Sequence, residues 1–357
     1  MMKKIILLLI AISVVLIFLT RSGIALELQL LSERMHFGCY SINHDRTIGC
    51  MNQYYNKLTE RAGPTIAMKD VRDGYDKYPD LRHLCHQVTH VIGRAAAARG
   101  DSLGVLFAEG DPFCWSGYYH GAVEGKLRGI STVRITSEFV NNFCRDIPKT
   151  ESNYFHYFNC VHGTGHAFMY VSHNDLPFAL SRCETFIAGD DKQNCAAGAF
   201  MENIVASQNE HNTKFIRANE PYFPCTIVNT LFIDTCYTAQ ATLIWQNTKY
   251  PKDAFRLCEE IPDTPSKHSC VEGLGREIAA GSMNTTAETI KGCEAASSSD
   301  TFSTCIIGAM KNFISYYHDD VLAKELCRSI DISTQIQCDT ERSAFIKLFA
   351  STTTAIQ

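Results

Sequence analysis

Short apolar stretches with helical spacing alternate with polar links along most of the chain. Each stretch ends or begins at a cysteine: DLPFALSRC (175–183) ends at one, and CAAGAFMENIV (195–205) begins at the next. Apolar residues three or four positions apart share one face of a helix, so each stretch predicts a short helix with one buried face. The links, such as EEIPDTPSKHS (259–269), are rich in Pro, Asp and Ser, which separate helices. The pattern predicts helical hairpins.

Most cysteines fall into pairs 11 or 12 residues apart, one pair to each predicted hairpin. The chain has 16 cysteines, an even number without any C-x-x-C pair, which favours disulfides over free thiols. Cys39 and Cys50 share this spacing, whereas the spacing of Cys85 and Cys114 leaves their pairing open. Cys144 and Cys160 form a wider pair. The disulfides that we expect within single repeats are Cys183–Cys195, Cys225–Cys236, Cys258–Cys270, Cys293–Cys305 and Cys327–Cys338.

The second cysteines of successive hairpins, from Cys160 to Cys338, follow one another at intervals of 33 to 41 residues. A period in this range is typical of α-solenoids, in which each hairpin buries its apolar face on its neighbours. The predicted fold is therefore all-α: disulfide-stapled helical-hairpin repeats that form an α-solenoid or α/α superhelix. The alternative is an irregular cysteine-rich helical domain, and six successive units in one register argue against it.

The amino-terminal segment has the features of a targeting sequence. Two lysines precede an apolar run from Ile5 to Leu19, and small residues provide a cleavage site after Ala25. We expect residues 1–25 to be a signal peptide or, where they are retained, an N-terminal membrane anchor. In both cases the body of the chain is secreted or membrane-anchored on the extracytoplasmic side, where cysteines form disulfides.

Composition and the common catalytic motifs narrow the classes of function. The chain has 357 residues, 45% of them hydrophobic, and a net charge of −5. No basic run follows the first ten residues, so we expect no nucleic-acid partner. The sequence contains neither a phosphate-binding P-loop nor a G-x-S-x-G nucleophile motif. Metal chemistry carried by histidine is the function class with positive support.

Two histidine pairs have the spacing of a helical chelate. His86 and His90 lie four residues apart just after a cysteine, and His162 and His166 repeat that arrangement. Residues four apart lie on the same face of a helix, with about 5–6 Å between their Cβ atoms. Two imidazoles at this distance can bind one metal ion together. We expect both pairs to be metal ligands.

A fifth histidine connects the two pairs. His120 and His166 each lie six residues after a cysteine, so neighbouring repeats place them side by side. Imidazole ligands favour a transition metal, with zinc, copper or iron as candidates. Five nitrogens exceed the four ligands of one tetrahedral zinc ion, so a dinuclear site or a non-zinc site stays open.

Glycine recurs three residues after the second cysteine of many repeats. Glycine inside a helix costs about 1 kcal/mol relative to alanine, so its recurrence needs a cause. We favour close contact between neighbouring helices over room for a bound group, because the repeats without histidine share it. The glycines are Gly117, Gly163, Gly198, Gly273 and Gly308.

Two glutamates are the candidates for catalysis beside the histidines. Glu124 lies four residues after His120, and Glu202 lies in the otherwise apolar sequence GAFMENI. Each could bind the metal, orient a histidine ligand, or act as a base on metal-bound water. A solvated or helix-paired glutamate is the alternative for both.

These observations lead to two hypotheses for function. The first is an extracytoplasmic metal-binding repeat protein, and in its finer form a hydrolytic or redox metalloenzyme, with the site in residues 26–221. Residues 222–357 are then structural or partner-binding repeats. The second hypothesis is a non-catalytic scaffold whose C-terminal repeats bind a protein or a glycan, with the histidines as packing residues. The membrane is a further partner only where the N-terminal segment is not cleaved.

Overall fold

The computed structural model describes residue 39 and residues 44–208, 213–282 and 285–349. The expected signal peptide or anchor at residues 1–25 lies outside these residues. Within them the structure has 16 α-helices and no strand, so the predicted all-α, disulfide-stapled repeat fold is confirmed. The helices from α2 to α9 are α2 (His44–Ala62), α3 (Pro64–Tyr75), α4 (Pro79–Ala97), α5 (Leu103–Ala108), α6 (Gly117–Leu127), α7 (Ser137–Phe143), α8 (Tyr154–Val171) and α9 (Leu176–Cys183).

The second half of the chain repeats a short helix followed by a long one. Polar residues of the links cap the long helices: Asp263 accepts a hydrogen bond from the backbone of Ser266, and Ser298 accepts one from Thr301. The remaining helices are α10 (Gly189–Gln208), α11 (Ile233–Asn247), α12 (Pro251–Glu259), α13 (Thr264–Gly281), α14 (Thr286–Cys293), α15 (Ser299–Tyr317), α16 (Val321–Arg328) and α17 (Ile332–Phe345).

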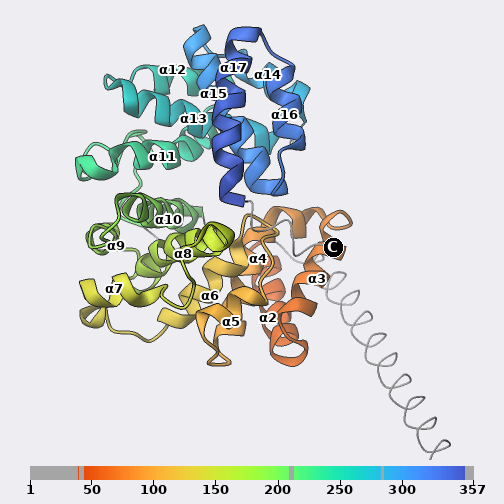
Figure 1. Ribbon diagram of the computed structural model, residues 1–357, viewed down its shortest axis with the longest axis vertical. Helices are drawn as coiled ribbons and strands as arrows, with labels where there is room; N and C mark the ends of the chain where they lie inside the picture. The colour runs from red at the N-terminus through yellow and green to blue at the C-terminus, as the bar shows by residue number, and fades with distance from the viewer. Residues whose placement is uncertain (1–38, 40–43, 209–212, 283–284, 350–357) are drawn as a thin grey trace, which may run out of the picture.

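The long helices stack in chain order (Figure 1). Helix α4 packs on α6, α6 on α8, and α8 on α10; the stack continues through α11, α13 and α15 to α17. Each long helix thus contacts the long helix before it and the one after it, as a solenoid requires. This stacking brings residues at equivalent repeat positions next to one another.

Eight disulfides staple the helices, and every expected pair is formed. Seven of them join a long helix to the segment just before it, and their cysteines are 11 to 16 positions apart in the sequence. Cys85–Cys114 differs, because it links α4 to the turn that begins α6 across 29 residues. The pairing left open by the spacing therefore ties together two neighbouring long helices.

One predicted hairpin lacks its first helix. Residues 213–229, which contain Cys225, form consecutive turns and no helix. Pro221 and Pro224 explain the difference, since proline removes a backbone donor and restricts the residue before it. The uniform hairpin expected at every cysteine pair is wrong here.

The carboxyl-terminal end of α15 returns to the first helices of the chain (Figure 1). The hydroxyl of Tyr316 donates a hydrogen bond of 2.8 Å to the hydroxyl of Tyr75 in α3. Tyr316 also packs on Trp115, with ring centroids 4.9 Å apart, and His318 packs on Phe155 of α8 at 5.1 Å. These contacts join the end of α15 to α3, to the turn that begins α6, and to α8.

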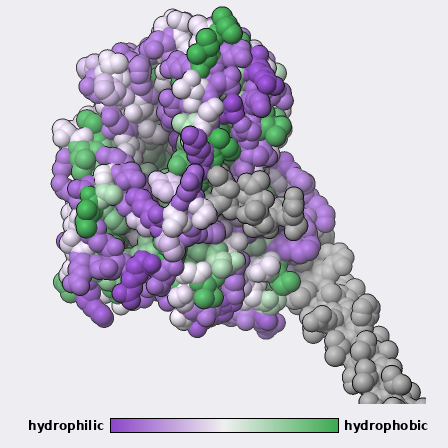
Figure 2. Space-filling view, viewed as in Figure 1, coloured by the Kyte–Doolittle hydropathy of each residue, from purple (hydrophilic) through white to green (hydrophobic). Residues whose placement is uncertain are grey.

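The surface in Figure 2 is mainly hydrophilic, with hydrophobic residues in small scattered groups. Val133, Ile187 and Ile332 are examples of apolar side chains that are mostly exposed. Among the described helices, none combines the length and the hydropathy that crossing a membrane requires.

Candidate metal centre

The five histidines singled out in the sequence lie together where α4, α6 and α8 pack against one another. His86 and His90 come from α4, His120 from α6, and His162 and His166 from α8. The ring centroid of His120 lies 5.5 and 5.4 Å from those of the α4 pair and 4.9 and 4.7 Å from those of the α8 pair. His120 therefore stands between the two pairs.

Glycines let these helices approach closely at the level of the histidines. A Cβ atom added to Gly117 of α6 would lie 2.6 Å from the carbonyl oxygen of His86. One added to Gly198 of α10 would lie 2.0 Å from the carbonyl oxygen of His162. Gly273 and Gly308 make equally close contacts in repeats without histidine. The recurring glycine is thus a helix-packing residue, as expected.

The α4 pair is held by hydrogen bonds at its outer nitrogens. Nδ1 of His86 lies 2.8 Å from the carbonyl oxygen of Cys114, and Nδ1 of His90 lies 2.9 Å from Oε1 of Glu124. The other oxygen of Glu124 accepts a hydrogen bond of 2.5 Å from Arg94. The two Nε2 atoms face each other at 3.1 Å.

The carbonyl that holds His86 belongs to a left-handed turn. Cys114, Trp115 and Ser116 have φ angles of 61°, 53° and 62°, a region that residues other than glycine seldom adopt. Three consecutive residues with positive φ form a strained backbone segment, and such strain is common at functional sites. The disulfide from Cys114 to Cys85, the neighbour of His86, fixes the turn beside the site.

The α8 pair repeats the arrangement of the α4 pair. Nδ1 of His166 lies 2.9 Å from Oε2 of Glu202 in α10. Nε2 of His166 faces Nε2 of His162 at 3.3 Å. His166 is fully buried, and the side chain of Glu202 is 20% exposed. Each pair therefore combines two imidazoles of one helix with a carboxylate from the next long helix.

The hydrogen bonds fix which nitrogens carry protons. The carbonyl oxygen of Cys114 can only accept, so Nδ1 of His86 is the donor and Nε2 of the neutral ring holds a lone pair. A carboxylate also only accepts, so Nδ1 of His90 donates to Glu124. When both rings are neutral, two Nε2 lone pairs face each other at 3.1 Å, a contact that a cation between them would make favourable.

Burial favours the neutral form of these imidazoles. It is the main cause that lowers the pKa of His86, His162 and His166 from 6.5 to about 3, and it holds the pKa of His120 well below its ordinary value. Burial alone would raise the pKa of the Glu124 carboxyl, but His90 and Arg94 outweigh it and keep this pKa below its usual range. Near neutral pH, His86, His120, His162 and His166 are therefore neutral, and the Glu124 carboxylate beside them is ionised.

The nitrogen spacing matches that of two ligands on one metal ion. Two nitrogens at about 2.0–2.1 Å from a tetrahedral zinc ion lie about 3.3–3.4 Å apart. The Nε2 atoms of the two pairs lie 3.1 and 3.3 Å apart. Three groups of residues have potential ligand atoms within 4.8 Å of one another and could hold a metal ion: His86 with His90 and His120; His120 with His162 and His166; and His90 with Glu124 and His166.

His120 has no other role in the hydrogen-bond network. Its side chain is buried, with 3% of its surface exposed, and neither ring nitrogen has a hydrogen-bond partner. Buried polar atoms without partners are costly and rare in folded proteins. A bound cation would satisfy at least one of these nitrogens.

The structure brings together all seven residues expected at the site, including Glu124 and Glu202. Both glutamates accept a hydrogen bond from Nδ1 of a histidine, which is the position of a residue that orients a ligand. The sequence analysis did not identify Arg94 or the carbonyl of Cys114. Arg94 lies four residues after His90, so its helical spacing could have shown it. A backbone carbonyl has no sequence signal.

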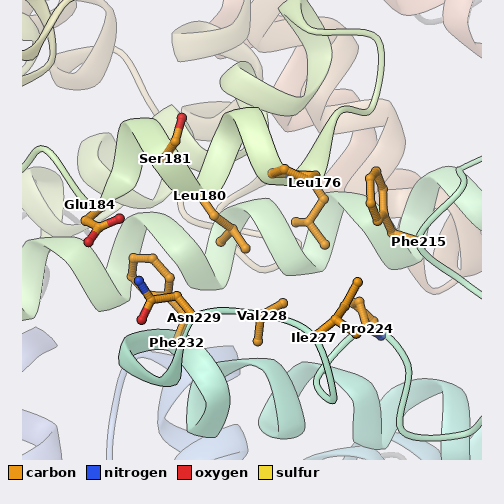
Figure 3. A pocket seen from close by; sticks show the side chains of 11 residues that line it. Leu176, Leu180, Ser181, Glu184, Phe215, Pro224, Ile227, Val228, Asn229 and Phe232 are labelled. Carbon is orange, nitrogen blue, oxygen red and sulfur yellow. The ribbon is translucent and has the colours of Figure 1, made fainter.

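A second concave feature lies apart from the histidines. An apolar cavity of about 200 Å³ lies between α9 and the segment that leads to α11. Leu176 and Leu180 of α9 face Ile227, Val228 and Phe232 across it (Figure 3). None of the five histidines lines this cavity.

Comparison of the chain with protein-family models, with curated proteins and with solved structures found no match. The site geometry and the fold therefore carry the functional interpretation.

Proposed function

We propose that this is an extracytoplasmic metal-binding repeat protein whose five clustered histidines hold a transition metal. The observation that carries the proposal is the pair of facing Nε2 atoms in each histidine pair, 3.1 and 3.3 Å apart. Hydrogen bonds at Nδ1 of His86, His90 and His166 direct the Nε2 atoms of these rings inward, which is the arrangement of histidines that bind a metal through Nε2.

The disulfides support both the compartment and the type of ligand. Eight disulfides persist in an oxidising environment, which agrees with a body outside the cytoplasm. They also take up every cysteine among the described residues, so the centre has nitrogen ligands and no thiolates. Zinc, copper and iron all suit imidazole nitrogen, and copper binds most tightly in the general order of affinities.

Glu124 and Glu202 act in this proposal as positioning residues. Each holds a histidine ring in the orientation and tautomer that metal binding needs, and each raises the basicity of its partner. A glutamate engaged in this way is poorly placed to take a proton from metal-bound water, so we assign the base role of a metalloenzyme to neither. The finer proposal of hydrolytic or redox catalysis rests on the open coordination position that three protein ligands leave.

Metal analysis of the full chain, purified without chelators from an oxidising compartment, tests the proposal. We expect one or two equivalents of a transition metal, and a lower content in His90→Ala and in His166→Ala. His318→Asn is the matched control, because it removes a partly buried histidine outside the cluster and leaves the metal content unchanged. A wild-type chain that neither contains metal nor binds added Zn²⁺ or Co²⁺ would favour the scaffold hypothesis instead.

A further inference from the structure

The candidate centre contains the same arrangement twice. In α4 and α6, two histidines four residues apart are followed by a glutamate of the next long helix, which accepts a hydrogen bond of 2.9 Å from the second histidine. In α8 and α10 the same three residue types make the same contacts, again at 2.9 Å. One ion held by all five histidines would not need two orienting glutamates on opposite sides. The duplication indicates one complete binding unit on each side of His120.

The distances also exclude a single ion bound by both histidine pairs. Ligands of one ion at about 2.0–2.1 Å from it lie within about 4.2 Å of one another. Among the described residues, no group with ligand atoms within 4.8 Å of one another contains both His86 and His162. The α4 pair and the α8 pair therefore cannot all bind a single ion in this arrangement. His120 belongs to a group with each complete pair, whereas the third group, His90 with Glu124 and His166, takes only one histidine from each pair and leaves His120 out.

On these grounds we infer that the centre is dinuclear: one ion bound by His86 and His90, a second by His162 and His166, with His120 between them common to both ligand sets. The inference rests on the proposed metal-binding function and adds the number of ions and their ligands. His120 fits a shared position because both of its ring nitrogens lack hydrogen-bond partners. As a bridge it would bind both ions as an imidazolate, with its remaining ring proton released to solvent.

The ligand sets also indicate what else the centre binds. Each ion has at most three imidazole ligands, so a position stays open on each. The other four histidines bind as neutral imidazoles, so Glu124, Glu202 and the shared His120 imidazolate offset only part of the charge of two divalent ions, and Arg94 adds positive charge. Buried charge requires compensation, so the open positions favour a small anionic ligand such as hydroxide.

Titration of the metal-free full chain with Co²⁺, followed by its visible absorption, tests the number of ions. We expect two equivalents in the wild type. The double variant His86→Gln with His90→Gln and the double variant His162→Gln with His166→Gln should each keep one equivalent. His120→Gln should weaken the binding of both ions. His318→Asn should keep two equivalents, and circular dichroism should report unchanged helix content in every variant.

The outcomes separate this inference from the proposed function. One equivalent in the wild type, abolished by either double variant, would overturn the dinuclear centre and leave metal binding established. No Co²⁺ bound by the folded wild type would overturn both. The wild-type stoichiometry decides the matter even where a double variant fails to fold, since it requires no substitution.

Discussion

The helix pair α8–α10 and the helix pair α13–α15 pack in the same way, but their polar residues do different things. A Cβ atom added to Gly165 would lie 1.9 Å from the carbonyl of Cys195, and one added to Gly275 would lie 2.0 Å from that of Cys305. Both glycines lie five residues after a repeat cysteine. The backbone contact is therefore shared between the two halves of the molecule.

The side chains at equivalent positions differ in their charge balance. Glu272 and Arg276 occupy the positions of His162 and His166, two and six residues after the cysteine. Glu272 accepts hydrogen bonds from Arg276 at 3.1 Å and from Lys311 at 2.8 Å, so opposite charges satisfy one another. The histidine pair instead places two Nε2 atoms face to face at 3.3 Å. The position in the repeat fixes where a side chain points. The type of residue at that position decides whether the site needs a ligand.

Exchange of the two sets of side chains should have the largest effect. His162→Glu, His166→Arg and Met201→Lys together place the ion-paired set in α8 and α10. We expect complete loss of the α8 ion, because the new side chains neutralise one another and provide no imidazole. Helix content should be unchanged, since the disulfides and glycines are kept. Metal analysis and circular dichroism measure the two results.

The reverse exchange makes the comparison sharper. Glu272→His, Arg276→His and Lys311→Met create a histidine pair with helical spacing in α13. We expect about one additional equivalent of Zn²⁺, bound more weakly than the native ions because no third ligand is provided. Glu272→Gln, Arg276→Gln and Lys311→Met form the matched control without imidazoles, and a gain of Zn²⁺ in that control would refute the explanation.

The shared backbone contact can be broken in either half. Gly165→Ala and Gly275→Ala should each lower the free energy of unfolding by about 1–3 kcal/mol or more, because the added methyl group meets a backbone carbonyl. Gly281→Ala in α13 is the control, since nothing lies within 4 Å of the added atom. It should stabilise the protein by about 0.5–1 kcal/mol through helix propensity. Urea unfolding with the disulfides intact gives these values.

Substitution of the orienting glutamates should have a smaller effect on metal affinity, confined to the N-terminal half. Glu124→Gln and Glu202→Gln should each weaken metal binding about 10- to 100-fold, since they remove the charge that holds a histidine ring. Glu277→Gln is the control: it occupies the repeat position of Glu202 and accepts a hydrogen bond of 2.7 Å from Thr242 instead of a histidine. Equal affinities in all three variants would show that the orienting bonds do not matter.

Sequence spacing was sufficient for the staples and for the histidines, because both depend on local helix geometry. A separation of 11 or 12 residues fits a short hairpin, and four residues fit one helix face. The partner of Cys85 was left open, since its bond crosses two repeats and has no fixed loop length. The turns around Cys225 were missed because the cysteine spacing outweighed the signal of Pro221 and Pro224.

The roles of the glutamates were harder to predict, because they depend on contacts between helices. The sequence placed Glu124 and Glu202 near the cluster but could not distinguish ligand, base and orienting residue. That distinction needs the 2.9 Å contacts to Nδ1 of His90 and His166. These contacts depend on the axial offset between neighbouring helices. Of the glycines that let α8 and α10 approach, Gly198 was recognised and Gly165 was not, and the distance they allow is a property of the packed structure.

The smallest expected effect is on the pH dependence of stability and concerns His318, a histidine outside the cluster. It follows the last residue of α15 with a φ of 60° and packs on Phe155. Burial lowers its pKa from 6.5 to about 4; Arg72 adds to this effect, and Asp111 opposes it. The unfolded chain then binds this proton more readily than the folded one, so His318 removes stability as the pH falls from about 6.5 toward 4.

His318→Asn, which tolerates the left-handed conformation, should abolish this contribution. Relative to the variant, the metal-free wild type should lose about 1–2 kcal/mol of unfolding free energy between pH 7 and pH 4.5. The cluster histidines titrate alike in both proteins, so the difference between the two urea curves isolates His318. A difference that stays constant over this pH range would show that the folded protein protonates His318 as readily as the unfolded chain does.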